Sequence, residues 1–246
     1  MPKHIEATLK RLDATPVSVI IPAHNEEPTV TTVVETAQRT RSIDEVIVVD
    51  DGSGDNTSKH AAEAGADVIR LEERRGKGAA MKAGLQKCRG EIVVFMDADL
   101  KRLEANQITS LMMPLADGYD LCKANFDRCG GRVTELTAKP LLKIFFPEIK
   151  LAQPLSGQKA IRRELLTSLD LEDHYGVDIA LLIDGVMRGA RVTETYIGQI
   201  DHQSHQLAKL AGTAEDVTRT ILYKAHRYGR LGRVKTLEHC LVPVQV

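Results

Sequence analysis

The sequence predicts an α/β protein in which a mainly parallel sheet is covered by helices on both faces. Four short apolar runs rich in β-branched residues lie within the first hundred residues, and such runs are typical of strands buried on both faces. Segments with helical spacing separate these runs, and polar motifs follow three of them. Strands and helices that alternate in this way form right-handed βαβ units.

The first half of the chain contains the regular part of this pattern. The predicted strands span residues 17–21, 46–49, 68–71 and 92–96. The predicted helices span residues 28–39, 55–64 and 77–87, with Pro28 in a first turn and Asp55 as a cap. In a parallel sheet of this kind the ligand site lies beyond the carboxyl ends of the strands. We therefore expect the functional residues in the loops that follow the strands.

The second half is less regular. We expect helices at residues 104–115, 176–188 and 213–228, a helix or turn at 140–146, and strands at 119–125 and 192–200. The sequence shows no internal repeat and no clear linker. We therefore expect one domain over residues 1–246, with a ligand-binding half at about 15–100 and a second lobe, ending in a C-terminal helix, at about 101–246.

The composition excludes several classes of protein. The chain is 43% hydrophobic and 27% charged with a formal net charge of −1, which excludes both a disordered chain and a broadly cationic nucleic-acid binder. Four scattered cysteines without a C-x-x-C pair indicate neither a disulfide framework nor a structural zinc site. No apolar stretch approaches the roughly 18 to 20 residues that span a bilayer, and the N-terminus lacks a signal-peptide core. We expect a soluble cytoplasmic protein.

Two aspartates follow the fourth predicted strand. Asp97 and Asp99 are separated by one small residue, so that both carboxylates can meet the same ligand cluster. Mg²⁺ and Mn²⁺ prefer oxygen ligands and commonly bridge a protein carboxylate to substrate phosphates. An Asp-x-Asp pair alone also occurs in many solvated loops. Its position at a strand end within the βαβ series favours the metal-binding interpretation.

Other polar residues near the strand ends allow both a functional and a structural interpretation. Asp50 and Asp51 follow the second strand, where a carboxylate could read a uracil or ribose edge or could form a turn. Asn25 and Glu26, after the first strand, allow the same alternatives. Lys77 lies beside glycines at a helix start, which suits a phosphate or base oxygen. A solvated surface lysine fits that spacing equally well.

Several motifs occur in a fixed order. The first half contains Val17-Ser-Val-Ile-Ile-Pro-Ala-His-Asn-Glu-Glu27, Val48-Val-Asp-Asp-Gly-Ser53, Gly76-Lys-Gly78 and Met96-Asp-Ala-Asp-Leu100. Together these motifs resemble the nucleotide-binding half of GT-A glycosyltransferases. The second half contains Gly130-Gly-Arg-Val-Thr-Glu-Leu136, Gln153-Pro-Leu-Ser-Gly157 and Tyr175-Gly-Val-Asp-Ile-Ala-Leu-Leu-Ile-Asp184, which resemble glucosyl-3-phosphoglycerate synthases. The resemblance implies a GT-A fold with a Rossmann-like nucleotide half and a C-terminal acceptor lobe.

The resemblance also implies roles for individual residues at the donor side. The nucleotide-sugar donor would be bound by Pro22, Ala23, Asn25, Glu26, Asp51, Ser53, Lys77, Asp97, Ala98 and Asp99. Asp178, Asp97 and Lys77 would act in catalysis, with Asp178 orienting groups rather than forming a covalent intermediate. A divalent metal, Mg²⁺ or Mn²⁺, would be held by Asp99 and a histidine. His202 best matches that histidine, with His205 and a plain surface histidine as alternatives.

For the acceptor, the resemblance implies a site for the phosphate and carboxylate of 3-phosphoglycerate formed by Gly131, Arg132, Thr134 and Gly157. An arginine fork with a hydroxyl and backbone N–H groups suits such an anion, although a salt-bridged surface Arg132 is the alternative. The chain departs from the family pattern at Asp178 and Gln158, where the family usually has glutamate. Since hydrogen-bonding groups around a sugar strongly affect selection, these departures leave the donor sugar and the acceptor open.

We therefore expect a metal-dependent hexosyltransferase that moves glucose from UDP-glucose to a small phosphorylated or carboxylated acceptor such as 3-phosphoglycerate, with retention of configuration as the resemblance implies. A polyprenyl-phosphate glycosyltransferase and a non-catalytic sugar-nucleotide-binding protein remain alternatives. A dinucleotide-binding oxidoreductase is disfavoured, because Pro22-Ala-His-Asn stands where Gly-x-Gly-x-x-Gly would be needed. We expect no nucleic-acid or membrane partner, and a homodimer stays open.

Overall fold

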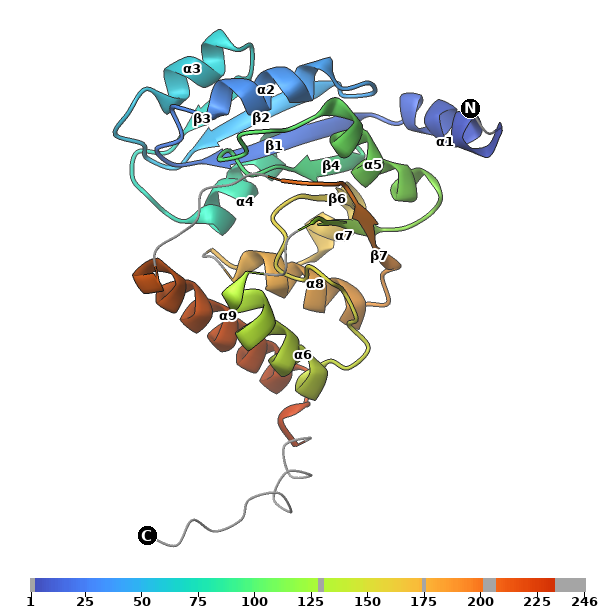
Figure 1. Cartoon of the computed structure of the whole chain (residues 1–246), viewed down its shortest axis with the longest axis vertical. Helices are drawn as coiled ribbons and strands as arrows, with labels where there is room; N and C mark the ends of the chain where they lie inside the picture. Colours follow the sequence, from blue (N-terminus) through green and yellow to red (C-terminus); the bar gives the residue numbers. More distant parts are fainter. Residues whose placement is uncertain (1–2, 128–130, 174–175, 201–206, 233–246) are drawn as a thin grey trace, which may run out of the picture.

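The computed structural model describes residues 3–127, 131–173, 176–200 and 207–232, and over these residues the strands form one seven-stranded sheet (Figure 1). The strand order is β3-β2-β1-β4-β6-β5-β7. Their bounds are β1 Val17–Ala23, β2 Glu45–Asp50, β3 Asp67–Arg70, β4 Ile92–Phe95, β5 Leu121–Asn125, β6 Lys159–Arg162 and β7 Val192–Tyr196. The expected α/β class with a mainly parallel sheet is confirmed.

One strand of the sheet runs against the others. The pairs β1–β2, β1–β4, β2–β3 and β5–β7 are parallel, whereas β6 is antiparallel to both β4 and β5. The carboxyl ends of the other six strands therefore meet at one edge of the sheet. Because β6 lies between β4 and β5, it joins the strands of the first half to those of the second.

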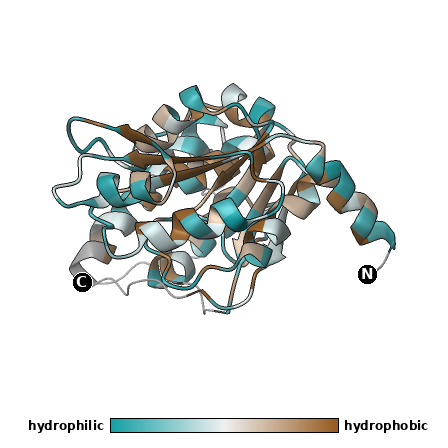
Figure 2. Cartoon of the chain, turned by 90° about the horizontal axis from the view of Figure 1, so that it is seen from above, coloured by the Kyte–Doolittle hydropathy of each residue, from teal (hydrophilic) through white to brown (hydrophobic). Residues whose placement is uncertain are grey.

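Helices cover both faces of the sheet (Figure 1). One layer contains α1 Lys3–Asp13, α2 Val30–Arg39, α3 Thr57–Glu63 and α5 Ala105–Ala116. The other layer contains α4 Lys77–Lys87, α6 Lys139–Phe145, α7 Arg163–Ser168, α8 Val177–Met187 and α9 Leu207–Arg227. A π-helical turn, η1 Thr134–Ala138, leads into α6. Figure 2 shows the apolar strands enclosed between these two layers.

Each layer encloses its own part of the core. Successive side chains of a strand point to opposite faces of the sheet. Val19 and Ile21 of β1 therefore face the α2 layer, while Ile20 faces α4. The central strands β1 and β4 are buried on both faces, as expected. The strand β3 is only half buried, because it lies at the edge of the sheet. The prediction that all four runs are buried on both faces was therefore wrong for β3.

Most predicted elements are present within one or two residues, and the differences lie where the pattern was weak. The helix expected at 213–228 begins at Leu207, and the strand expected at 192–200 ends at Tyr196. The sequence did not indicate α1, β6 or α7. The lysine at the start of β6 and the polar residues of α7 hide the usual apolar periodicity.

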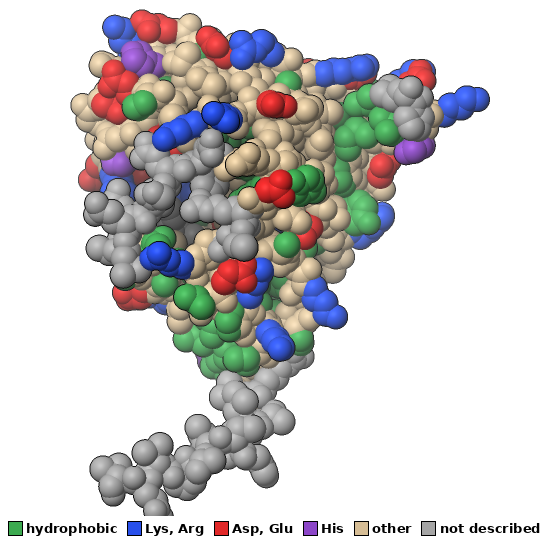
Figure 3. Space-filling model, viewed as in Figure 1, with side chains coloured by type: hydrophobic (Ala, Val, Ile, Leu, Met, Phe, Trp, Pro, Cys, Tyr) green, Lys and Arg blue, Asp and Glu red, His purple; other side chains and the backbone are tan. Residues whose placement is uncertain are grey.

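The surface carries a few exposed apolar side chains on the α9 side. Leu136, Ile144 and Tyr223 are exposed, and Figure 3 shows hydrophobic side chains gathered at the lower end of the molecule, where α6 and α9 lie. Among the residues that the structure describes, no helix combines the length and the apolar character that crossing a membrane requires.

Candidate active site

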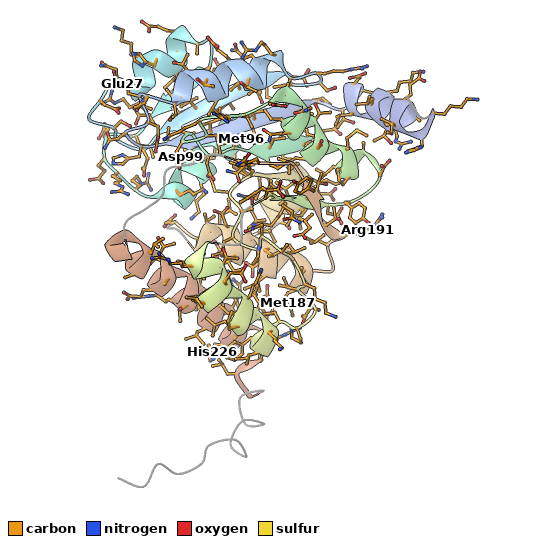
Figure 4. All side chains as sticks on the ribbon, viewed as in Figure 1. Glu27, Met96, Asp99, Met187, Arg191 and His226 are labelled. Atoms are coloured by element: carbon orange, nitrogen blue, oxygen red, sulfur yellow. The ribbon has the colours of Figure 1, made fainter. Side chains whose placement is uncertain are left out.

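A cavity of about 740 Å³ lies beyond the carboxyl ends of β1, β2 and β4. Its lining comprises Pro22, Ala23, His24, Asn25, Glu26, Pro28, Asp51, Arg74, Gly76, Lys77, Ala80, Asp97, Ala98, Asp99, Gly212, Thr213 and Asp216. Figure 4 shows Asp99 at the same end of the sheet as Glu27, whereas Arg191, which precedes β7, lies at the other end. All the residues expected at the donor except Ser53 line this cavity.

Ser53 does not line the cavity but binds Asn25, which does. Its buried hydroxyl oxygen accepts a hydrogen bond of 2.9 Å from the backbone N–H of Asn25. Asn25 has a φ of 56°, a left-handed conformation that asparagine adopts more readily than most residues. Its amide oxygen accepts a 2.9 Å hydrogen bond from the backbone N–H of Gly54. The loops after β1 and β2 are thus tied together.

Asp51 anchors the loop that leads into α4. One carboxylate oxygen accepts a 2.7 Å hydrogen bond from the N–H of Arg75, and the other accepts a 2.8 Å bond from the N–H of Gly76. Gly76 caps α4 with a φ of 100°, a conformation that favours glycine. Lys77 directly follows Gly76 in the chain. Asp51 therefore lines the cavity and also fixes the start of α4, where Lys77 lies.

Lys77 brings together the three residues expected to act in catalysis. Its ammonium donates a 2.7 Å hydrogen bond to Asp97 and a 2.9 Å bond to Asp178. Burial alone would lower the pKa of Lys77, but Asp178 and Asp97 together raise it above its ordinary value. Lys77 is therefore a firmly charged cation at the floor of the cavity. A cation placed in this way can stabilise a phosphate oxygen.

Asp97 is held from a second side by the segment before β6. The side-chain amide of Gln158 donates a 2.7 Å hydrogen bond to the second carboxylate oxygen of Asp97. Gly157 permits this approach, since a Cβ at that position would lie 2.1 Å from the same oxygen. The sequence had suggested Gly157 as an acceptor contact. In the structure it makes room for Asp97.

Two lysines lie beneath Asp178 on adjacent strands. Lys159 of β6 and Lys123 of β5 face each other in the sheet register, and both are fully buried. Lys159 donates hydrogen bonds to the Asp178 carboxylate at 2.5 Å and to the Gly157 carbonyl at 2.9 Å. The Lys123 ammonium lies 3.3 Å from the Asp178 backbone carbonyl.

The pKa values of these groups follow from burial and mutual charge. Burial lowers the pKa of Lys123 to about 7, although Asp178 acts in the opposite direction. Burial also lowers the pKa of Lys159. Burial would raise the pKa of Asp178, but Lys159, Lys77 and Lys123 hold it well below its usual range. Asp178 is therefore an ionised counter-ion for the lysines around it.

The acidic side of the cavity suits a divalent cation. Glu26, Asp97 and Asp99 all line this part of the cavity, and burial, followed by the charge of Asp99, raises the pKa of Glu26. Asp99 is a half-buried carboxylate at the cavity wall, and oxygen ligands of this kind fit Mg²⁺ or Mn²⁺. The described residues contain no cluster of three metal-ligating side chains. His202 and His205, the expected histidines, lie outside the described residues.

Of the residues expected at the acceptor, only Gly157 lies against a residue of this cavity, Asp97. Gly131 and Arg132 are exposed and Thr134 is buried, at the start of the helical segment that continues into α6. None of these three residues lines the donor cavity as described. The backbone carbonyl of Gly131 accepts a hydrogen bond of 3.1 Å from the N–H of Glu135. Their contact with an acceptor stays a prediction.

Several cavity residues were missed from the sequence. Gly212, Thr213 and Asp216 come from α9, and no local pattern connects that helix with β1 or β4. His24, whose ring nitrogen lies 2.8 Å from the Asp51 carbonyl, and Arg74 also line the cavity. His24 lies inside the first quoted motif and Arg74 lies two residues before Gly76, and their position beside expected donor residues could have identified them.

Comparison with protein families and known proteins gives consistent results. Residues 18–169 match the family described as glycosyl transferase family 2. The chain is similar to the glucosyl-3-phosphoglycerate synthase of Mycolicibacterium smegmatis, with 38% identity over 231 residues that cover 84% of this chain and 76% of that protein. The corresponding enzyme of Mycolicibacterium paratuberculosis is 37% identical over 234 residues, which cover 84% of this chain and 71% of the relative.

A solved structure adds the ligands of a relative. The crystal structure of glucosyl-3-phosphoglycerate synthase from Mycobacterium tuberculosis in complex with Mn²⁺, UDP-glucose and phosphoglyceric acid has a TM-score of 0.85 and 36% identity. The match covers 90% of this chain and 84% of that one. The similarity extends over both halves of the sheet.

Proposed function

The chain belongs to glycosyl transferase family 2 and, within it, to the glucosyl-3-phosphoglycerate synthases, and on that premise we propose that it transfers glucose from UDP-glucose to 3-phosphoglycerate. The observation that carries the proposal is the cavity at the carboxyl ends of β1, β2 and β4, where Lys77 is held between two carboxylates. The M. tuberculosis relative was solved with UDP-glucose and phosphoglyceric acid bound.

The cavity provides suitable groups for a nucleotide-sugar donor. The loops after β1 and β2 form one wall, and we assign them to the nucleoside. Lys77 lies at the start of α4 and supplies a fixed positive charge for the diphosphate. The N-terminus of α4 adds its dipole to that charge. Asp97 lies beside Lys77 and is assigned to the sugar and diphosphate region.

A divalent metal completes the donor site. Homologous structures contain Mn²⁺ or Mg²⁺ together with UDP, and this cofactor fits the acidic side of the cavity. Asp99 would hold it, and we assign His202 as a second ligand. When bound, the cation neutralises charge that develops on the leaving diphosphate. Lys77 stabilises the same leaving group from the floor of the cavity.

The transfer itself exchanges one bond at the anomeric carbon for another. The acceptor hydroxyl forms a bond to this carbon as the bond to the β-phosphate oxygen breaks, and the hydroxyl proton passes to the departing phosphate. Both carboxylate oxygens of Asp178 are bonded to lysines, so Asp178 is not placed to act as a nucleophile. This supports direct transfer without a covalent enzyme intermediate. Retention, which the family resemblance implies, then requires the acceptor hydroxyl to attack from the face that the diphosphate leaves.

We assign residues 131–134 to the acceptor. Arg132 is exposed, so that its guanidinium is accessible to a phosphate or carboxylate.

We further propose that residues 1–246 act as one domain, since β6 joins strands of both halves in one sheet. A cytoplasmic location is also proposed, and the free thiols of Cys88 and Cys122 agree with a reducing compartment.

The decisive experiment follows both products. The protein is incubated with UDP-glucose and Mn²⁺, with and without 3-phosphoglycerate, and free UDP and the glucosyl product are measured. UDP should form at a substantial rate only with the acceptor present, and the anomeric proton should show the configuration of the donor. A folded protein that binds UDP but forms no glucosyl product would contradict the proposal.

A further inference from the structure

Lys159 occupies an unusual position for a charged residue. It begins β6 and is fully buried. It lies opposite Phe95 of β4 and Lys123 of β5 in the register of the sheet. Its ammonium lies 4.8 Å from the centre of the Phe95 ring. Both lysines therefore point to the α4 and α8 side of the sheet, directly behind the donor cavity.

This arrangement is costly for folding. Like charges directly opposite one another on paired strands are destabilising, and a buried charge is tolerated only when it is paired and hydrogen-bonded. An apolar side chain at position 159 would extend the core that Ile161 forms on the same face. The chain instead provides Asp178 from α8 as a counter-ion. The stability of the core alone does not account for Lys159.

The contacts of Asp178 connect Lys159 to the cavity. One carboxylate oxygen accepts the bond from Lys159, and the other accepts the bond from Lys77. Lys77 then bonds to Asp97. Lys77 and Asp97 line the cavity, whereas Asp178 and Lys159 do not. The four residues thus form a row in the order Lys159, Asp178, Lys77 and Asp97. The first two lie behind the cavity wall and hold the last two, which line the cavity.

We propose that Lys159 is a positioning residue of the donor site: it holds one oxygen of Asp178, so that the other oxygen keeps the Lys77 ammonium beside Asp97. The inference rests on the proposed function, because it assigns the Lys77 ammonium to the donor diphosphate. Lysine has a long side chain with many rotamers, and restricting it in advance lowers the entropy lost on binding. Lys159 acts through Asp178 and makes no contact with substrate.

The test is a double-mutant cycle on Lys159→Met and Asp178→Asn. Each single variant should lower kcat/KM for UDP-glucose by about tenfold or more and weaken UDP binding in the presence of Mn²⁺, while the KM for 3-phosphoglycerate stays within about twofold. If Lys159 acts through Asp178, the double variant should lose no more than about twofold beyond the poorer single variant. Losses that multiply, or a folded Lys159→Met enzyme with wild-type donor kinetics, would overturn the proposal.

Lys224→Met is the matched control. Lys224 of α9 is also fully buried and bonds to a buried aspartate, Asp184, at 2.8 Å, but it does not line the donor cavity. The Lys224→Met variant should have a lower melting temperature than the wild type and an unchanged KM for UDP-glucose. An equal rise of donor KM in this variant would indicate a general effect of removing a buried lysine and would count against the proposal.

Two further variants test the proposal if Lys159→Met does not fold. Lys159→Gln keeps a hydrogen-bond donor without the charge, and Lys159→Arg keeps the charge and should restore part of the donor affinity. Unfolding of all three Lys159 variants would show that Lys159 serves the fold and would overturn the proposal. UDP binding by calorimetry does not need turnover. Absence of transfer in the wild type therefore counts against the proposed function, whereas absence of coupling counts against the positioning role.

Discussion

Gln158 donates a 2.7 Å hydrogen bond from its side-chain amide to Asp97, on the oxygen that Lys77 leaves free. The same amide group accepts a 3.1 Å bond from the Ser156 hydroxyl through its oxygen. The orientation of the amide is thus fixed at both ends. A neutral donor at position 158 suits the Asp97 carboxylate as an acceptor, because a glutamate there would place two carboxylates in hydrogen-bond contact.

Gln158→Glu should therefore make activity depend on pH. Two carboxylates that share a site raise one pKa strongly, so one proton must be held between them. At about pH 8 kcat/KM for UDP-glucose should fall by about tenfold, and part of it should return at about pH 6, where the pair holds a proton. Steady-state kinetics over this range provide the measurement. Gln107→Glu is the control, since the buried Gln107 amide donates to the carbonyl of Ile197 outside the donor cavity.

Asp99→Asn should remove metal-dependent activity while the protein stays folded. The change keeps the side-chain volume and removes the charge of a half-buried group at the cavity wall. Activity should fall by roughly a hundredfold or more at saturating Mn²⁺, and EDTA should abolish the activity of the wild type until Mn²⁺ or Mg²⁺ is restored. A melting curve verifies the fold. Full activity of the folded variant, or of the wild type in EDTA, would refute a ligand role for Asp99.

Lys77→Met should weaken the donor site strongly and should leave acceptor binding unchanged. It removes the cation and leaves Asp97 and Asp178 facing each other. We expect kcat/KM for UDP-glucose to fall by about a hundredfold or more. The raised pKa means that the ammonium stabilises the fold below its ordinary pKa of 10.5 and loses this effect only as the pH rises above that value. If the wild type loses donor affinity as the pH changes near neutrality, deprotonation of Lys77 is therefore not the cause.

Lys123 should make the free energy of unfolding rise with pH above neutrality. Its pKa is about 7 in the folded protein and 10.5 as a free side chain, so the unfolded chain binds more protons between these values. Stability should then increase with pH over this range by up to about 1.4 kcal/mol per pH unit. The groups that act on Lys123 are Asp178, Lys159, Lys77 and Asp97.

The measurement is urea unfolding of wild type and Lys123→Met at several pH values. Lys123→Met should lack the increase and should be relatively more stable at about pH 6, where the buried wild-type lysine carries its charge. Titrating groups that do not interact with Lys123 contribute equally to both proteins and cancel in the difference. Parallel pH profiles for the two proteins would show that Lys123 does not titrate in this range.

Arg132→Ala should raise the KM for 3-phosphoglycerate and hardly change UDP binding. A hydrogen bond to a charged group is worth about 1.5 to 3 kcal/mol, which corresponds to an increase of about 10- to 150-fold. Because Arg132 is exposed, the melting temperature should not change. Kinetics with 3-phosphoglycerate, glycerate and a neutral polyol give the comparison. Preference for the neutral polyol, or an unchanged KM in the variant, would exclude an anion site at Arg132.

The parts of the fold that the sequence predicted are those in which local pattern and burial agree. The strands β1, β2 and β4 are apolar and central, so their runs are unbroken. The strand β6 could not be recognised, because Lys159 interrupts its apolar face and its pairing partners are distant in sequence.

The same distinction holds for the site. Lys77, Asp97 and Asp178 were expected together and are linked by hydrogen bonds, although Asp178 comes from a helix a hundred residues away. The contribution of α9 to the cavity could not be seen from sequence, since Thr213 and Asp216 are placed by tertiary packing. The buried state of Lys123 and Lys159 was also hidden, because a lysine normally predicts a solvated surface.

The position of β6 has a consequence for how the chain is made. During synthesis β4 leaves the ribosome before residues 159–162, and at about 5 to 20 residues per second the interval is of the order of several seconds. Throughout that time the outer edge of an apolar strand has no partner, and an open edge of this kind invites pairing with another chain. A fragment that ends near residue 100 would keep this open edge permanently. Such a fragment should aggregate, and nascent chains of intermediate length should be substrates for chaperones.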